Sequence, residues 1–256
     1  MQKTPICSET YKIASFMLNL QGRAGPFSIV NLIQDIGWLH AIRLGIRQPK
    51  NLGWVFTRQV LTLQRYPVWH EELTIRTWLR APGKDPFLYR DYELFIGEQK
   101  IGQCTSTFAV MDLQLRKLAP QDWSQYPDVW RHEACLTAKP GKIELPVDVK
   151  DLIVLQVRNS DIDSNNHVNN TRYAQWILDA VPIQLLRSPI QVSKYEINFL
   201  AEAKLGDAIR IQKSTSEGFE GPNCVVHFQG LLEQSQKIAF AARLSLHNMQ
   251  DSQKAS

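Results

Sequence analysis

Residues 161–170 read Asp-Ile-Asp-Ser-Asn-Asn-His-Val-Asn-Asn, and they run directly into 171–180, an apolar stretch of helical period. Two acids, four asparagines and one histidine therefore stand at a helix entry, where the first backbone N–H groups have no partner inside the helix. Carboxylates, amide groups and N–H donors gathered in one place suit an enzyme that holds a carbonyl group and activates water beside it. We expect this segment to begin a helix and to mark a reaction site.

The same order of elements occurs twice along the chain. Apolar residues at helical spacing predict a helix over 27–46, with Pro26 before its start and Gly45 near its end. The polar cluster opens a second helix at about Asn169, which Pro182 should kink or end. Alternating patterns predict strands at 54–64, 72–79, 87–95 and 101–111 after the first helix, at 153–158 before the second, and at 192–199, 208–213, 223–232 and 237–246 after it.

Two segments support an internal duplication. Residues 58–75 and 194–211 each contain an alternating strand, a short connector, an acid and a second alternating strand. The acid is Glu71 or Glu72 in the first segment and Asp207 in the second. We therefore predict an α+β fold of two halves, each with an antiparallel sheet around one long helix. The expected division is 1–115, a loop-rich linker over 116–147, and 148–256.

Composition narrows the class of protein. The 256 residues are 44% hydrophobic and 21% charged, as in ordinary globular proteins. No apolar run is long enough for a membrane span, and the start shows no secretory signal pattern, so we expect a cytoplasmic protein. The four cysteines are far apart, without a CxxC pair, which argues against a disulfide framework or a zinc site. A net charge of +4 fits either an unremarkable surface or one that docks an acidic partner; no nucleic-acid signature accompanies it.

His167 differs from the other histidines because Asp163 and Asn165 precede it at alternate positions. In an extended loop these three side chains would project to one side. The competing interpretation is that an Asx-rich segment only makes turns and helix caps. Asn169 or Asn170 is the better cap candidate, because the helical period begins just after them.

Glu202 lies among apolar residues between two strand patterns. It is either a solvent-facing residue at a strand end or a carboxylate carried to the helix entry, where it would act as a general base near His167. Asp207 after Gly206 is typical of a turn. The absence of GxSxG, P-loop, GxGxxG and HExxH motifs argues against a serine hydrolase elbow, a nucleotide site and a zincin.

Three parts of the sequence together resemble the acyl-acyl-carrier-protein thioesterases, the plant plastid enzymes and their bacterial relatives. They are 31–41, the pair 54–58 and 65–69, and 161–170 with Tyr173 and Trp176. The resemblance runs from about residue 8 to 247. It implies a double hotdog fold and hydrolysis of the thioester between a fatty acyl chain and the phosphopantetheine arm of acyl carrier protein. It implies no cofactor and no metal.

Carried onto this chain, the resemblance makes Asp163, Asn165, His167 and Glu202 the active-site residues. The plant enzymes have a cysteine directly after the acid, whereas this chain has Ala203, so a cysteine nucleophile is excluded at that position. Glu202 would take a proton from water, Asn165 and His167 would hold water and thioester, and Asp163 would orient its neighbours. Backbone N–H groups over 168–170 would stabilise the oxyanion.

The first half has no such cluster at its helix entry, so its apolar residues are candidates for an acyl tunnel. These candidates are Ile33, Ile36, Trp54, Phe56 and Trp78. Docking of an acidic acyl carrier protein would involve cations near the site, for which the candidates are Arg172, Lys194 and Lys204.

Two other functions stay open from the sequence. One is a thioesterase of the same fold that acts on coenzyme A esters, and the other is a non-catalytic acyl-binding hotdog module. A second copy of the chain, in a homodimer, is the remaining candidate partner.

Overall fold

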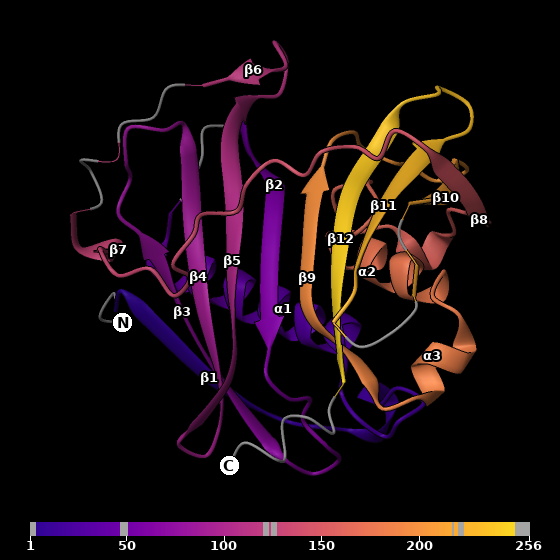
Figure 1. The fold of residues 1–256 in the computed structure, drawn as a ribbon. Helices are drawn as coiled ribbons and strands as arrows, with labels where there is room; N and C mark the ends of the chain where they lie inside the picture. The colour runs from indigo at the N-terminus through magenta and orange to yellow at the C-terminus, as the bar shows by residue number, and fades with distance from the viewer. Residues whose placement is uncertain are drawn as a thin grey trace.

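The computed structural model describes residues 4–46, 51–119, 123, 127–216, 218–219 and 223–248. One large antiparallel sheet spans both halves, and α1 and α2 lie on the same side of it (Figure 1). The first half supplies β1 (Ile6–Lys12), α1 (Pro26–Leu44), β2 (Leu52–Leu63), β3 (Glu72–Arg80), β4 (Phe87–Ile96) and β5 (Gln99–Asp112). The second supplies β8 (Val149–Gln156), α2 (Asn170–Asp179), α3 (Ile183–Arg187), β9 (Ile190–Phe199), β10 (Ala208–Ser214), β11 (Val225–Leu232) and β12 (Ile238–Asn248).

Strand order repeats between the halves. Outward from the centre, the first half runs β2-β5-β4-β3-β1 and the second runs β9-β12-β11-β10-β8. The two central strands join the halves, with pairs from Arg58↔Asn198 to Thr62↔Lys194. Each half is thus one helix and one antiparallel sheet in the same topology, which confirms the predicted tandem α+β architecture.

The helix ends follow local sequence. Pro26 occupies the first turn of α1, and Gly45 ends the helix in the left-handed region with φ 64°, a conformation that costs glycine little. Ile29, Ile33 and Ile36 are almost completely buried in the core against the sheet. α2 ends at Asp179, ahead of Pro182, which confirms the predicted stop.

Strand β1 and the short helix α3 were not predicted. Within β1 only Cys7 is buried, and the strand carries Ser8, Glu9 and Thr10 at the edge of the sheet. Such a polar edge strand lacks the apolar alternation on which strand prediction rests.

The predicted linker crosses the first half and also contains structure. β6 (Lys117–Leu118) pairs with β5, and β7 (Trp130–Arg131) pairs with β3. The boundaries at 115 and 148 stay a prediction. Within the described ranges, no helix combines the length and the apolar character needed to cross a membrane.

Candidate active site

A tight turn precedes α2. The Asp163 N–H donates to the His167 carbonyl oxygen at 2.9 Å, and the Asn166 N–H donates to the Asp163 carbonyl oxygen at 3.1 Å. Asn166 has a φ of 67°, in the left-handed region that asparagine tolerates better than most residues. The loop therefore reverses direction, and the expectation of three side chains on one face of an extended loop was wrong.

Asp163 organises this turn through its carboxylate. Its Oδ1 accepts the Asn165 N–H at 2.8 Å and lies 3.5 Å from the His167 N. The side chain thus holds the backbone that carries Asn165 and His167. This agrees with an orienting role and gives Asp163 no direct contact with Glu202.

The β9–β10 connection docks against the same turn. Val168 donates its N–H to the Ala203 carbonyl oxygen at 3.0 Å. The Lys204 N–H donates to Asp207 Oδ2 at 2.8 Å, so Asp207 does form the predicted turn. These bonds place Glu202 beside the helix entry, with its Oε2 3.6 Å from His167 Nε2.

The Glu202–His167 pair is accessible from solvent. The two side chains are 36% and 38% exposed. A separation of 3.6 Å is slightly longer than a direct hydrogen bond, so neither group is saturated by the other. In such a pair the carboxylate can accept a proton from water, and the imidazole N–H can donate a hydrogen bond.

The structure adds Arg116 to this pair. Its guanidinium lies 3.3 Å from Glu202 Oε2 and 3.4 Å from Glu202 Oε1. Arg116 stands in the turn between β5 and β6, so it comes from the first half. The sequence placed it at the start of the linker, and no local motif marks it.

The expectation about backbone oxyanion donors needs correction. The N–H groups of Val168 and Asn169 donate to the carbonyl oxygens of Ala203 and Asp161, at 3.0 and 2.8 Å. Both are therefore occupied and are not oxyanion donors in this conformation. Asn165 is exposed on the turn, and its predicted contact with water and thioester stays a prediction. The predicted cap is confirmed, since Asn169 Oδ1 accepts the Thr171 N–H at 3.0 Å.

The first helix has a copy of this turn. The Asn19 N–H donates to the Arg23 carbonyl oxygen at 2.8 Å, and the Gly22 N–H donates to the Asn19 carbonyl oxygen at 2.9 Å. Gly22 has a φ of 70°, matching Asn166. Asn19 Oδ1 accepts the Gln21 N–H at 2.9 Å, as Asp163 does for Asn165. The duplication therefore extends to individual hydrogen bonds.

The docking of the strand connection is also repeated. The Ala24 N–H donates to the Pro67 carbonyl oxygen at 2.8 Å, as Val168 does to Ala203. Tyr66 consequently occupies the position of Glu202, and Arg23 that of His167. The first copy keeps the backbone of the site and has lost its carboxylate and imidazole.

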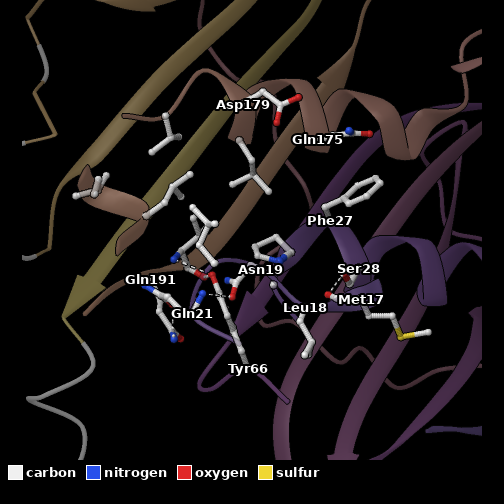
Figure 2. A pocket seen from close by; sticks show the side chains of 18 of the residues that line it. Met17, Leu18, Asn19, Gln21, Phe27, Ser28, Tyr66, Gln175, Asp179 and Gln191 are labelled. Atoms are coloured by element: carbon white, nitrogen blue, oxygen red, sulfur yellow. Dashed lines mark hydrogen bonds between the residues drawn. The ribbon is translucent and has the colours of Figure 1, made fainter. Parts of the chain in front are cut away.

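Tyr66 turns this first copy into a contact between the halves. Its hydroxyl donates to the Val192 carbonyl oxygen and accepts the Val192 N–H, both at 2.9 Å, and burial raises the pKa of Tyr66. Gln21 Nε2 donates to the Ser188 carbonyl oxygen at 2.5 Å. A half-open groove of about 420 Å³ lies beside these residues, between the start of α1 and the end of α2, with a mainly apolar lining (Figure 2).

Replacing Tyr66 by Phe should lower the free energy of unfolding by about 1–3 kcal/mol, because the buried N–H and C=O of Val192 would lose their partner. Denaturant unfolding of the two proteins measures this difference. Tyr11→Phe is the matched control, since its hydroxyl bonds an exposed carboxylate, Asp35. Equal stability of Tyr66→Phe and Tyr11→Phe would contradict a stabilising contact between the halves through Tyr66 and Val192.

Comparison with known proteins identifies the family of the chain. Residues 6–122 match the family model described as the acyl-ACP thioesterase N-terminal domain, and residues 146–251 match the C-terminal domain of the same family. The chain belongs to the acyl-ACP thioesterase family. The resemblance drawn from the sequence is therefore confirmed. The two family domains correspond to the two halves of the fold.

Individual relatives in the family are distant. The chain is 25% identical over 235 residues to a chloroplastic dodecanoyl-[acyl-carrier-protein] hydrolase of Cinnamomum camphora, covering 82% of this chain and 59% of that protein. It is 28% identical over 204 residues to the chloroplastic acyl-[acyl-carrier-protein] hydrolase FATB3 of Cuphea viscosissima, covering 70% of this chain and 48% of that protein. The chain thus spans about half to three-fifths of the length of these relatives.

The fold matches solved structures closely. A crystal structure of an acyl-ACP thioesterase from Bacteroides thetaiotaomicron aligns with a TM-score of 0.81 at 23% identity, covering 96% of this chain and 100% of that one. A 12:0-ACP thioesterase from Umbellularia californica aligns with a TM-score of 0.81 at 20% identity, covering 96% and 95%. The predicted double hotdog fold is confirmed.

Proposed function

We propose that this protein hydrolyses the thioester between a fatty acyl chain and acyl carrier protein and releases the free fatty acid. The observation that carries the proposal is the accessible Glu202–His167 pair, 3.6 Å apart at the entry of α2. Family membership supports the substrate class, and the names of the distant relatives agree with it.

In the proposed reaction, Glu202 accepts a proton from a water molecule as the water oxygen attacks the thioester carbonyl carbon. His167 donates a hydrogen bond to the carbonyl oxygen as negative charge develops there. The carbon–sulfur bond then breaks, and the proton held by Glu202 passes to the departing sulfur. The products are a carboxylic acid and the thiol of the carrier arm, with no covalent enzyme intermediate.

A row of aromatic rings leads from this site into the first half. Phe199 precedes Glu202 by one short loop, and its ring centre lies 5.0 Å from that of Phe56. Phe56 stacks on Phe108 at 4.9 Å, and Phe108 contacts Trp54 at 5.8 Å. These four rings are only partly buried, although they come from the central strands. Partly exposed rings beside a reaction site favour binding of an apolar chain, so we assign this row to the acyl chain.

The aromatic row includes only some of the residues that the sequence suggested as lining an acyl tunnel. Trp54 and Phe56 belong to it. Trp78 does not belong to the row. Its neighbour Leu79 packs toward Leu44 of α1. Trp78 points to the opposite face of the sheet, where its indole N–H donates to the Glu133 carbonyl oxygen of the linker. Ile33 and Ile36 are 1% and 0% exposed, so a larger residue there would overpack the core.

Replacing Phe56 by Ala should shift the preferred substrate toward longer acyl chains, because it removes a ring from the proposed path. Each added methylene changes discrimination by roughly 10–200-fold when a pocket gains or loses room for it. Relative kcat/KM on a panel of acyl carrier protein thioesters measures the shift. Phe95→Ala, which removes a ring that contacts Arg76 instead, is the matched control. An unchanged chain-length profile in Phe56→Ala would contradict this path.

The carrier protein would dock around Glu202. Exposed Lys204 and the exposed side chains of Leu200 and Leu205 share its loop. Arg172 and Lys194, the other predicted docking cations, already contact Asp161 and Glu196, which favours Lys204 among the three. Comparing kcat/KM on matched acyl carrier protein and coenzyme A thioesters separates the proposal from a coenzyme A thioesterase, and any thioester hydrolysis excludes a non-catalytic module.

The proposal includes a cytoplasmic location. All four cysteines are free, and two of them, Cys7 and Cys104, are buried. Unpaired thiols suit a reducing compartment.

A further inference from the structure

The turn between β5 and β6 is built to present Arg116. Asp112 Oδ1 accepts the N–H groups of Gln114 and Leu115 at 2.9 and 2.8 Å, and the Arg116 N–H donates to the Asp112 carbonyl oxygen at 2.8 Å. The Leu113 N–H donates to the Asn51 carbonyl oxygen at 2.9 Å, which ties the turn to the start of β2. The turn is therefore anchored at both ends rather than loose.

Arg116 has a backbone conformation in this turn that other residue types adopt more readily. Its φ is 55°, in the left-handed region where glycine and asparagine are the usual residues. Arginine gains nothing there from local backbone chemistry. Strained backbone positions cluster at functional sites, and this one lies against Glu202.

The guanidinium faces both oxygens of the Glu202 carboxylate. Nη1 lies 3.4 Å from Oε1 and from Oε2, and Nη2 lies 3.3 Å from Oε2. His167 Nε2 approaches the same Oε2. Two cationic or donor groups therefore gather on Oε2, while Oε1 has a single long contact among the described residues and is the oxygen better placed to accept a proton from water.

We propose that Arg116 is a positioning residue of the first half that orients the Glu202 carboxylate of the second half for proton abstraction. This inference rests on the proposed function, in which Glu202 is the general base. In this arrangement one half supplies the base and the other fixes its direction. It differs from a docking role, because Arg116 would act on every thioester, with or without a carrier protein.

The test uses the full chain and an acyl thioester of N-acetylcysteamine, a neutral substrate without carrier protein or phosphate. Arg116→Asn removes the guanidinium and keeps a residue that favours the left-handed turn, so the turn should fold at least as well. Lys117→Asn removes the same charge from the neighbouring exposed residue. We expect Arg116→Asn to lower kcat about tenfold, within the range of coupling between contacting residues, with KM changed less than about twofold. Arg116→Lys should recover part of kcat, and Lys117→Asn should match the wild type.

A double-mutant cycle completes the test. If Arg116 acts through Glu202, adding Arg116→Asn to Glu202→Gln should cause no further loss. The role of Arg116 would be overturned if Arg116→Asn caused an equal loss of kcat in both backgrounds, or if its kcat matched that of Lys117→Asn. In either case, an impaired Glu202→Gln protein would still support the proposed function. A Glu202→Gln protein with wild-type kcat would instead refute the proposed function itself.

Discussion

Glu202→Gln is expected to lower kcat on an acyl carrier protein thioester by roughly 10²–10⁴-fold, the contribution of a general base. Glutamine keeps the size of the side chain and its place beside His167, but it cannot accept the proton of the attacking water. The fold should not change, because Glu202 is 36% exposed and its contacts are the loose ones to Arg116 and His167. Steady-state release of free fatty acid measures kcat, and circular dichroism checks the fold.

Glu144→Gln is the matched control for this substitution, because that carboxylate is 81% exposed in the linker. It should retain wild-type turnover. A Glu202→Gln protein as active as Glu144→Gln would rule out Glu202 as the base.

His167→Ala is expected to lower kcat by about 10²–10³-fold, as removal of an oxyanion donor does. His167 is a side-chain donor at the helix entry next to Glu202, and the neighbouring N–H groups of Val168 and Asn169 are already bonded. The backbone of His167 should stay in place, since the bond from the Asp163 N–H to its carbonyl oxygen does not use the ring. Stopped-flow or steady-state hydrolysis assays measure the loss.

His132→Ala, at an exposed residue of the linker, is the control for loss of an imidazole. Glu202→Gln and His167→Ala together should cost less than the product of the two single losses, because both residues act in one step. Fully multiplicative losses would show that the pair does not act together.

The sequence was most informative where local chemistry decides structure. Pro26, Gly45 and Asn169 marked helix ends that the structure has within a residue or two. Alternating strands predicted the order of elements in both halves, and that order was enough to detect the duplication. Local pattern also singled out the turn that carries His167, since few segments combine acids, amides and an imidazole ahead of a helix.

The sequence was less informative where contacts join distant segments. Arg116 reaches Glu202 across the boundary between the halves, and nothing beside it in the chain records that contact. Asp163, Asn165 and His167 stand at alternate positions, and this spacing fits an extended strand as well as a chain reversal. The direction of the loop depends on the left-handed Asn166. Trp78 and Leu79 are adjacent large apolar residues of β3, so the sequence alone does not show which of them faces the helix and which faces the linker.

The two helix entries show how one repeated turn has taken two roles. Asp163 and Asn19 hold the same reversal, but His167 and Glu202 stand where the first half has Arg23 and Tyr66. In the second half the turn leaves a carboxylate and an imidazole open to solvent. In the first half Tyr66 closes the same place by bonding Val192 of β9. The stability of the joined halves and the reactivity of the site thus come from the same backbone motif.

The most direct measurement is free fatty acid released from a panel of acyl carrier protein thioesters, from about eight to eighteen carbons, by the wild type and by Glu202→Gln side by side. We expect turnover by the wild type with a peak at some chain length and a loss of about a hundredfold or more in Glu202→Gln at that length. Absence of release across the panel by the folded wild type, or equal release by the two proteins, would contradict this expectation.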